Sequence, residues 1–138
     1  MRTPTSPSAT LSCPCGSGRA YGDCCGCFHA GKVPPDAEAL MRSRYCAYVL
    51  QDEAYLLATW HATTRPARLH LSDGPRTQWL GLEVRRHVAT GEDGAIVEFI
   101  TRFKIGGRAE RLHEMSRFVC QDGRWFYVDG EFSDRRSP

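Results

Sequence analysis

Near the start of the chain, four cysteines stand within thirteen residues as C-x-C, eight intervening residues and an adjacent pair. They are Cys13, Cys15, Cys24 and Cys25, and the segment of residues 12–30 around them has almost no apolar side chains to bury. A segment of this kind folds only when a metal or cross-links hold it, so metal binding and folding should be one event. Sulfurs at this density can converge on one ion, and the pattern predicts a zinc knuckle with tetrahedral thiolate ligation.

The alternatives to this site are a pair of disulfides, free thiols, or a zinc site with a different fourth ligand. Adjacent ligands such as Cys24 and Cys25 are more strained than a C-x-x-C pair, and Cys27 and His29 are both within reach. The chain has seven cysteines, an odd number where a secreted disulfide framework normally uses an even one. No apolar signal segment opens the chain, so we expect a cytoplasmic protein whose thiols stay reduced.

The pattern C-P-C-G-S-G-x-x-Y-x-x-C-C, from Cys13 to Cys25, resembles the SEC-C motif, a small zinc-binding module first noted at the end of the bacterial preprotein-translocase ATPase SecA. The chain departs from the motif at Gly22 and Asp23, where a lysine or other polar side chain is usual. The resemblance implies zinc as the cofactor. From the role of the motif in SecA, it also implies a surface that meets another protein.

Size and charge narrow the remaining choices. The 138 residues have room for one ordinary domain with a small appendage, and no apolar run approaches the roughly 18 residues of a membrane-spanning helix. The net charge is +2 and the basic residues are scattered, which argues against nucleic acid as a partner of Arg19, Lys32, Arg42 and Arg44. We expect a flexible tail over 1–11, the knuckle over 12–30, a linker over 31–35, a domain over 36–132 that folds without the knuckle, and a tail over 133–138.

Two helices should open the domain. Asp36 can cap a helix over residues 37–50, whose apolar side chains recur at the spacing of one helical face. Arg42 and Arg44 flank that face, and we expect both at a solvated edge. Asp52 can cap a second, short helix that carries Trp60 near its end.

From Trp79 onward apolar and polar residues alternate with a period of two. Glycine-containing turns interrupt the alternation at residues 91–94, 106–107 and 121–123, which divides it into four strands joined as an antiparallel meander. Helices followed by such a sheet predict an α+β fold with the long helix lying on the concave face of a curved sheet.

Several segments of the chain resemble the bacterial YchJ-like family, and the similarity covers nearly all residues from Cys13 to Gly130. They are ALMRSRY at 39–45, YLLATWH at 55–61, WLGLEV at 79–84, EMSRF at 114–118 and GRWFYVDG at 123–130. The resemblance implies a SEC-C zinc knuckle followed by a cone-shaped α+β domain of the nuclear-transport-factor-two-like superfamily, with helices packed on the curved antiparallel sheet.

Cones of this superfamily commonly enclose a pocket. The polar and aromatic side chains that we expect around it are Tyr45, Tyr48, Trp60, His61, Glu98, His113 and Glu114. His113 and Glu114 are neighbours on a strand and should point to opposite faces, so they are not expected to act as an acid–base pair. Cys46 and Cys120 lie far from the knuckle in sequence, and we expect both as small buried side chains.

The sequence favours a zinc-binding protein-interaction module over an enzyme, because a four-cysteine site with no spare ligand position is of the structural kind. The alternative is a small-molecule-binding or enzymatic cone that the knuckle only locates. Homodimerisation through the sheet, which is frequent in the superfamily, is a further arrangement to consider.

Overall fold

The computed structural model describes residues 11–71 and 76–135. The expected tail over 1–11 lies outside these ranges apart from Leu11, and so do residues 136–138. Along the part of the chain that is described, no helix is long and apolar enough to cross a membrane. The elements in chain order are η1 (Tyr21–Asp23), α1 (Cys25–His29), α2 (Ala37–Leu50), α3 (Glu53–Ala58), β1 (Thr77–Ala89), β2 (Gly94–Ile105), β3 (Arg108–Gln121) and β4 (Arg124–Arg135).

Both expected helices begin at their expected caps. The carboxylate of Asp36 accepts a hydrogen bond at 2.8 Å from the backbone N–H three residues on, and Asp52 accepts the equivalent bond at 3.1 Å. Gln51 ends α2 with a left-handed φ of 59°, which turns the chain sharply into α3. Trp60 lies beyond the end of α3 rather than on it, and pairs with Tyr127 of β4 as an isolated parallel bridge.

The sheet is the expected antiparallel meander, with strand order β1-β2-β3-β4. Register shifts in β1, between Trp79 and Gly81 and again after Val84, and in β3 after His113 and Arg117 add local twist, which curves the sheet. β4 continues to Arg135, so the first three residues of the tail expected over 133–138 belong to the strand.

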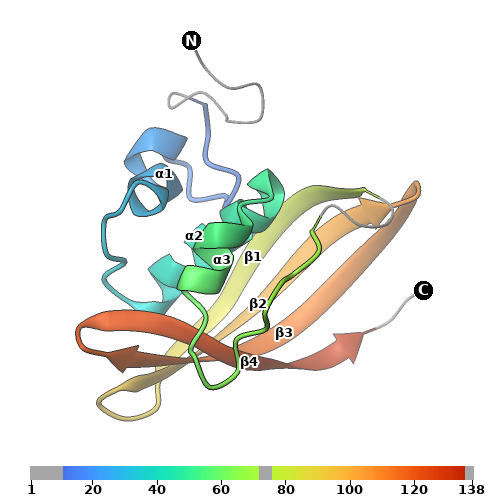
Figure 1. The fold of residues 1–138 in the computed structure, drawn as a ribbon. Coiled ribbons are helices and arrows are strands. Elements are labelled where there is room, and N and C mark those ends of the chain that lie inside the picture. Colours follow the sequence, from blue (N-terminus) through green and yellow to red (C-terminus); the bar gives the residue numbers. More distant parts are fainter. Residues whose placement is uncertain (1–10, 72–75, 136–138) are drawn as a thin grey trace.

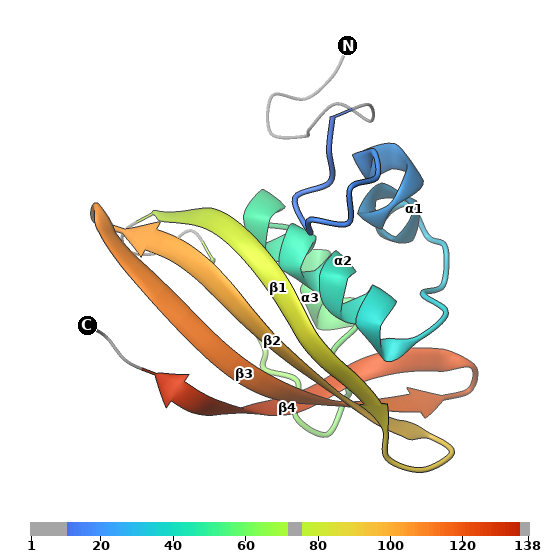
Figure 2. The same cartoon turned by 180° about the vertical axis from the view of Figure 1, so that it is seen from behind.

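The helices and the sheet form two layers. Figure 1 shows α2 and α3 on one face of the sheet, which bends around them, and the view from behind in Figure 2 shows the same arrangement. Alternate residues of β2, namely Ala95, Val97 and Phe99, are buried in the core that α2 shares. The expected α+β class, with a cysteine knuckle ahead of helices on a curved antiparallel sheet, is therefore confirmed.

The knuckle (residues 12–30) does not stand apart from the domain. Its four cysteines belong to the same buried cluster as Leu40, Met41 and Cys46 of α2. Polar contacts join the two parts as well, because His29 Nε2 lies 2.8 Å from the carbonyl oxygen of Ser43. Helix α2 is thus buried on two sides, by the sheet and by the knuckle. The knuckle, which the sequence predicted to be a separate appendage, is packed into the core.

Candidate metal centre

Cys13 and Cys15 lie on a loop that folds back on itself before η1. Ser12 and Ala20 pair as an isolated antiparallel bridge, which closes the base of this loop. Gly16 turns the chain within it at a φ of 81°, a left-handed conformation that disfavours any side chain. The C-x-C segment is therefore held as a tight turn with both of its sulfurs buried.

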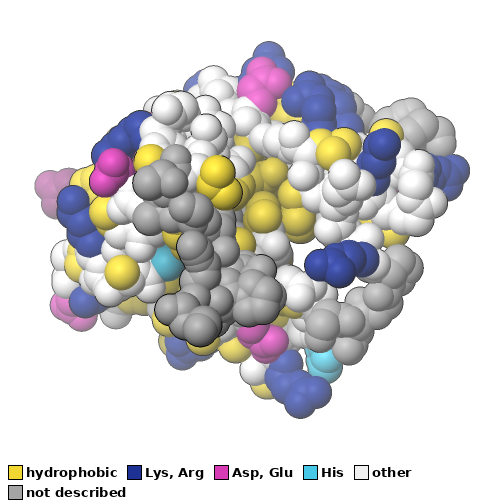
Figure 3. Space-filling view, turned by 90° about the horizontal axis from the view of Figure 1, so that it is seen from above, with side chains coloured by type: hydrophobic (Ala, Val, Ile, Leu, Met, Phe, Trp, Pro, Cys, Tyr) yellow, Lys and Arg dark blue, Asp and Glu magenta, His cyan; other side chains and the backbone are white. Residues whose placement is uncertain are grey.

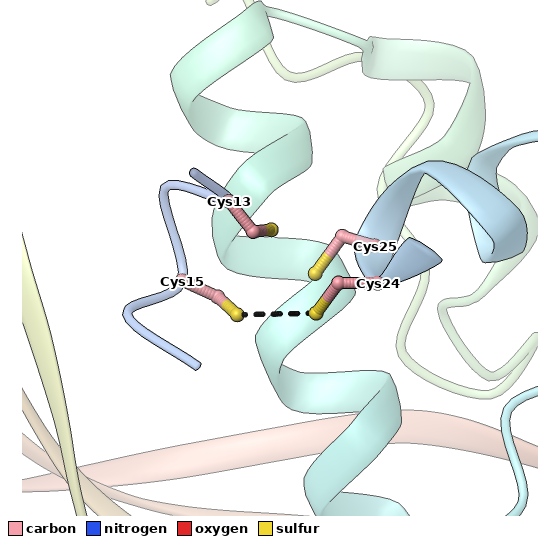
Figure 4. Close-up of side chains that lie close together, drawn as sticks. All are labelled: Cys13, Cys15, Cys24 and Cys25. Atoms are coloured by element: carbon pink, nitrogen blue, oxygen red, sulfur yellow. Dashed lines mark hydrogen bonds between the residues drawn. The ribbon is translucent and has the colours of Figure 1, made fainter. Parts of the chain in front are cut away.

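Cys24 and Cys25 stand at the start of α1, which packs closely on η1. The close approach requires Gly26, since a Cβ at this position would lie 2.7 Å from the backbone oxygen of Tyr21. Both cysteine side chains point from the beginning of α1 toward the C-x-C loop, in front of α2 (Figure 4).

The four knuckle sulfurs converge on one point. The Sγ atoms of Cys13, Cys15, Cys24 and Cys25 all lie within 4.8 Å of one another, and all four residues are buried. The Sγ atoms of Cys15 and Cys24 are 3.7 Å apart, close to the roughly 3.8 Å between neighbouring sulfurs of a tetrahedron whose metal–sulfur bonds are 2.3 Å. The donor set and its spacing thus fit a divalent metal that prefers thiolates.

Crowding spreads the pKa values of these thiols apart. Hydrogen bonds from the Cys13 and Cys25 thiols hold the pKa of Cys15 well below its ordinary value. The same contacts raise the pKa of Cys25, first through Cys13 and then through Cys15. Arg42 lies beside Cys15, with Nη1 donating to the Cys15 carbonyl oxygen at 2.9 Å. Metal binding to such a cluster releases protons, because only thiolates act as ligands.

The two alternative fourth ligands are engaged elsewhere. The thiol of Cys27 donates to the carbonyl oxygen of Gly22 at 3.1 Å. His29 uses both ring nitrogens, with Nδ1 2.7 Å from the Tyr21 hydroxyl and Nε2 on the backbone of α2. Neither residue belongs to the group of four sulfurs that the described part of the chain brings together.

Cys46 was expected to be buried away from the knuckle, and the structure places it beside the knuckle. It is fully buried on α2, as expected, yet its Sγ lies 3.4 Å from Cys13 Sγ, so it borders the metal centre. Thirty-three residues separate the two cysteines, and only the packing of α2 against the knuckle brings them together. Cys120 on β3 is half-buried, so the expectation of a buried side chain is wrong there.

A second candidate site is a cavity of about 380 Å³ between α2 and the concave face of the sheet. Four of the residues expected around a pocket line it, namely Tyr45, Tyr48, Trp60 and Glu114. Most of its remaining walls are apolar and include Trp79 and Phe99. The volume lies within the range of small-molecule sites, although near the lower end.

Arg44 is the main departure from expectation in this cavity. The sequence placed it at a solvated edge, but it is only 5% exposed and lines the cavity. Its Nη1 donates to the Leu56 carbonyl oxygen at 2.8 Å and to the Thr59 hydroxyl at 2.7 Å. The guanidinium carbon lies 5.0 Å from the ring centre of Trp60 and 4.5 Å from that of Tyr127, so two aromatic faces stabilise the buried cation.

Glu114 faces the same cavity from β3. Its Oε2 accepts hydrogen bonds from Ser116 Oγ at 2.8 Å and from the Tyr127 hydroxyl at 3.4 Å. Burial raises the pKa of this carboxyl above its usual range, and these two hydrogen bonds oppose the shift in part. Gly130 on β4 leaves room for it, since a Cβ there would lie 2.9 Å from Glu114 Cδ.

The other three expected pocket residues do not line the cavity. His61 is bound to Gln121 of β3, with Nε2 2.8 Å from the amide oxygen. His113 pairs with Glu98 at 2.6 Å, away from Glu114. The side chains of His113 and Glu114 therefore have different neighbours, as their adjacent positions on one strand predict.

Two known family models match the chain. Residues 36–130 match the family model for the middle NTF2-like domain of YchJ, and residues 11–26 match the SEC-C motif. The chain belongs to the YchJ-like family. A UPF0225 protein of Ralstonia nicotianae is 56% identical over 138 residues, covering 92% of this chain and 95% of the relative. A UPF0225 protein of Methylibium petroleiphilum is 57% identical over 129 residues, which are 93% of each chain.

Two solved structures have the same fold. The solution structure of a SEC-C motif containing protein from Rhodopseudomonas palustris is 38% identical, with a TM-score of 0.78 over 88% of this chain and 98% of that one. The crystal structure of a SEC-C motif containing protein from Psychrobacter arcticus is 27% identical, with a TM-score of 0.75 over 94% and 86%. The resemblance of the sequence to the YchJ-like family and its SEC-C motif is thus confirmed.

Among the residues of this YchJ-like chain whose surroundings the sequence did not predict are Arg44 at the cavity and Cys46 beside the metal centre. Arg44 follows Met41 by three residues and precedes Tyr48 by four, so helical periodicity could have placed it on the cavity-lining face. No comparable signal marks Cys46, because its contact with Cys13 depends on how the knuckle docks on α2.

Proposed function

We propose that this YchJ-like protein is a zinc-binding protein-interaction module of the bacterial cytosol and not a zinc enzyme. The observation that carries the proposal is the burial of the four knuckle cysteines, which are 0–7% exposed. Catalytic zinc keeps a position open to water or substrate, whereas a closed set of four thiolates holds a structural ion. Zinc is the ion that best suits four thiolates at tetrahedral spacing, and reduced thiols suit the cytosol.

The metal is tested first, by elemental analysis of protein purified without added zinc. We expect one zinc per chain and about three thiols that are not metal ligands, since four of the seven cysteines would be ligands. The partly exposed Cys27 and Cys120 should react in the native state, and the buried Cys46 only after unfolding. A chain that is folded and contains no zinc would overturn the proposal.

The surface around the knuckle suits a protein partner better than a nucleic acid. Figure 3 views the molecule from above, the side on which the knuckle lies in Figure 1, and basic side chains are spread singly around this face. Hydrophobic side chains gather nearer its centre. Leu11, at the base of the C-x-C loop, is 56% exposed, so it is an apolar side chain beside the knuckle whose burial by a protein partner would be favourable.

Affinity capture with purified protein tests the interaction. Cys13→Ser/Cys15→Ser removes two ligands, and Leu11→Ser changes the surface while leaving all the sulfurs in place. We expect both variants to lose the same partner, while Leu11→Ser keeps its zinc. The control Cys120→Ser, on β3, should retain the partner and the zinc. Identical partner lists for all variants would contradict an interaction through the knuckle.

The cavity supports a second candidate function, the binding of a small molecule. Its walls are mainly apolar, with the Arg44 cation already engaged by Leu56 and Thr59. Among the described residues, both hydrogen bonds to the Glu114 carboxyl end at Oε2, so Oε1 is the acceptor that a ligand would use. The chemistry favours a mostly apolar molecule with one hydroxyl or amide donor.

A thermal-shift screen of such molecules on the full chain tests this candidate, because a ligand of the folded state raises its melting temperature. We expect hits whose shift is lost in Glu114→Ala, which removes the acceptor, and kept in Glu98→Ala, which removes a carboxyl that does not line the cavity. Shifts that persist unchanged in Glu114→Ala would place the ligand elsewhere.

A further inference from the structure

Two oxygen atoms on the concave face of the sheet open into the cavity without a hydrogen-bond partner. Glu114 on β3 and Thr101 on β2 both line the cavity and are only 9% and 5% exposed. Among the described residues, Glu114 Oε1 and Thr101 Oγ1 make no hydrogen bond. The same part of the chain has no fully enclosed side-chain oxygen or nitrogen that lacks a partner, so both atoms must be open to the cavity itself.

The register of the sheet holds these two side chains close together. Glu114 pairs directly with Phe99, and Thr101 follows Phe99 by two residues, so all three face the cavity. Diagonal neighbours of this kind stand about 7 Å apart. An amide carries its donor N–H and its acceptor C=O side by side, and with a hydrogen bond of about 2.9 Å at each end it spans that gap.

Charge on the walls favours a neutral ligand. Arg44 and Glu114 both line the cavity and are buried, and in the described part of the chain neither has an ion-pair partner. Tyr127 stands between them, since the Arg44 guanidinium lies 4.5 Å from its ring centre and its hydroxyl donates to Glu114 at 3.4 Å. A carboxylate on the ligand would oppose the ionised Glu114, and an ammonium group would oppose Arg44, with little water to screen either repulsion.

We propose that the cavity binds a neutral lactam or carboxamide carried on a flat aromatic ring. Its N–H donates to Glu114 Oε1, and its carbonyl oxygen accepts from Thr101 Oγ1. Trp60, Trp79 and Phe99 supply aromatic walls, which favour a flat ring. The proposal deepens the small-molecule binding proposed above and rests on it, because it adds a second polar contact and so disfavours ligands that carry a donor alone.

A matched set of bicyclic probes tests the ligand class on the full chain. Oxindole carries the lactam N–H and C=O, indole keeps only the N–H, and N-methyl-oxindole keeps only the C=O. Isothermal titration calorimetry should give oxindole an affinity about tenfold higher than that of either relative, which is the difference expected for one hydrogen bond. Indole carboxylate, the charged relative, should bind more weakly than indole. Equal affinities of oxindole and indole, or tighter binding of the carboxylate, would overturn the proposal.

Variants identify the second polar contact. Thr101→Val removes the hydroxyl and keeps the shape of the side chain, so oxindole should bind about tenfold more weakly while the affinity of indole is unchanged. Glu114→Ala should weaken the binding of both compounds. Thr77→Val is the matched control, since Thr77 lies in β1 and does not line the cavity. Far-UV circular dichroism verifies that each variant is folded.

The outcomes separate the two proposals. If indole binds and is lost in Glu114→Ala, but oxindole binds no more tightly and Thr101→Val has no effect, the lactam class is wrong and the small-molecule site stands. If none of the probes and no compound of the thermal-shift screen binds, both proposals fail.

Discussion

Gly130→Ala provides the sharpest test of the buried polar cluster in the cavity. A Cβ at this position would lie 2.9 Å from Glu114 Cδ and 3.1 Å from Cγ, and closer still to Oε2. Contacts under 3.0 Å are essentially never observed for a real Cβ, so the carboxyl or strand β4 must move. Moving the carboxyl breaks the 2.8 Å hydrogen bond that Ser116 donates to Oε2.

The size of the effect follows from these contacts. Overpacking a core costs about 1–3 kcal/mol, and leaving a buried hydrogen-bonding group without its partner costs about 1–3 kcal/mol. A shift of the Glu114 carboxyl relieves the overpacking but breaks its hydrogen bond with Ser116, so the two costs do not add in full. We therefore expect the free energy of unfolding to fall by about 3 kcal/mol. That is a large part of a typical stability of about 5–15 kcal/mol, yet it should leave a folded protein.

Urea unfolding followed by tryptophan fluorescence measures this cost in two backgrounds. In Glu114→Ala the side chain that meets the new Cβ is gone, so Gly130→Ala should then cost less than about 1 kcal/mol. Gly81→Ala is the matched control, since Gly81 also lies in a strand and a Cβ there would meet nothing within 4 Å. Equal costs of Gly130→Ala in both backgrounds would refute the reasoning and assign Gly130 a backbone role instead.

Three other predictions concern the cavity and the metal centre. Burial raises the pKa of Glu114 in the folded state, so its contribution to stability is complete below its unfolded pKa, near 4.5, and is lost as pH rises through the folded pKa. Urea titrations should therefore show the stability of wild type falling relative to Glu114→Gln as pH rises above 4.5, and parallel pH profiles would contradict this. Gly26→Ala places a Cβ 2.7 Å from the Tyr21 backbone oxygen and should weaken zinc binding about tenfold or more in chelator competition, whereas Gly81→Ala should not. Arg44→Met leaves the Leu56 carbonyl and the Thr59 hydroxyl without their donor and removes the cation from two aromatic rings. It should lower stability by about 2–4 kcal/mol, against less than about 1 kcal/mol for Arg102→Met on the exposed side of β2.

The elements that the sequence predicted well depend on neighbours along the chain. Asp36 and Asp52 cap their helices through backbone groups three residues away, and such contacts are visible in any sequence. The meander follows from alternating strands joined by short turns, which leave antiparallel pairing as the simplest connection. The cysteine spacing belongs to the same class, because a C-x-C turn and an adjacent pair eight residues later need no distant partner to converge.

What the sequence alone determined, then, is the fold class and a cluster of four sulfurs that fits a metal. Only the tertiary structure decided what surrounds that cluster and the cavity. Helix α2 is covered on both sides, so Arg44 is buried under Trp60 and Tyr127 instead of lying at a solvated edge. The same packing brings Cys46 to 3.4 Å from Cys13 across thirty-three residues of chain. The physical reason is that burial and long-range contact depend on how whole elements pack. Helical periodicity places Arg44 on the same face as Met41 and Tyr48 but does not say what covers that face, and no local pattern marks the contact of Cys46.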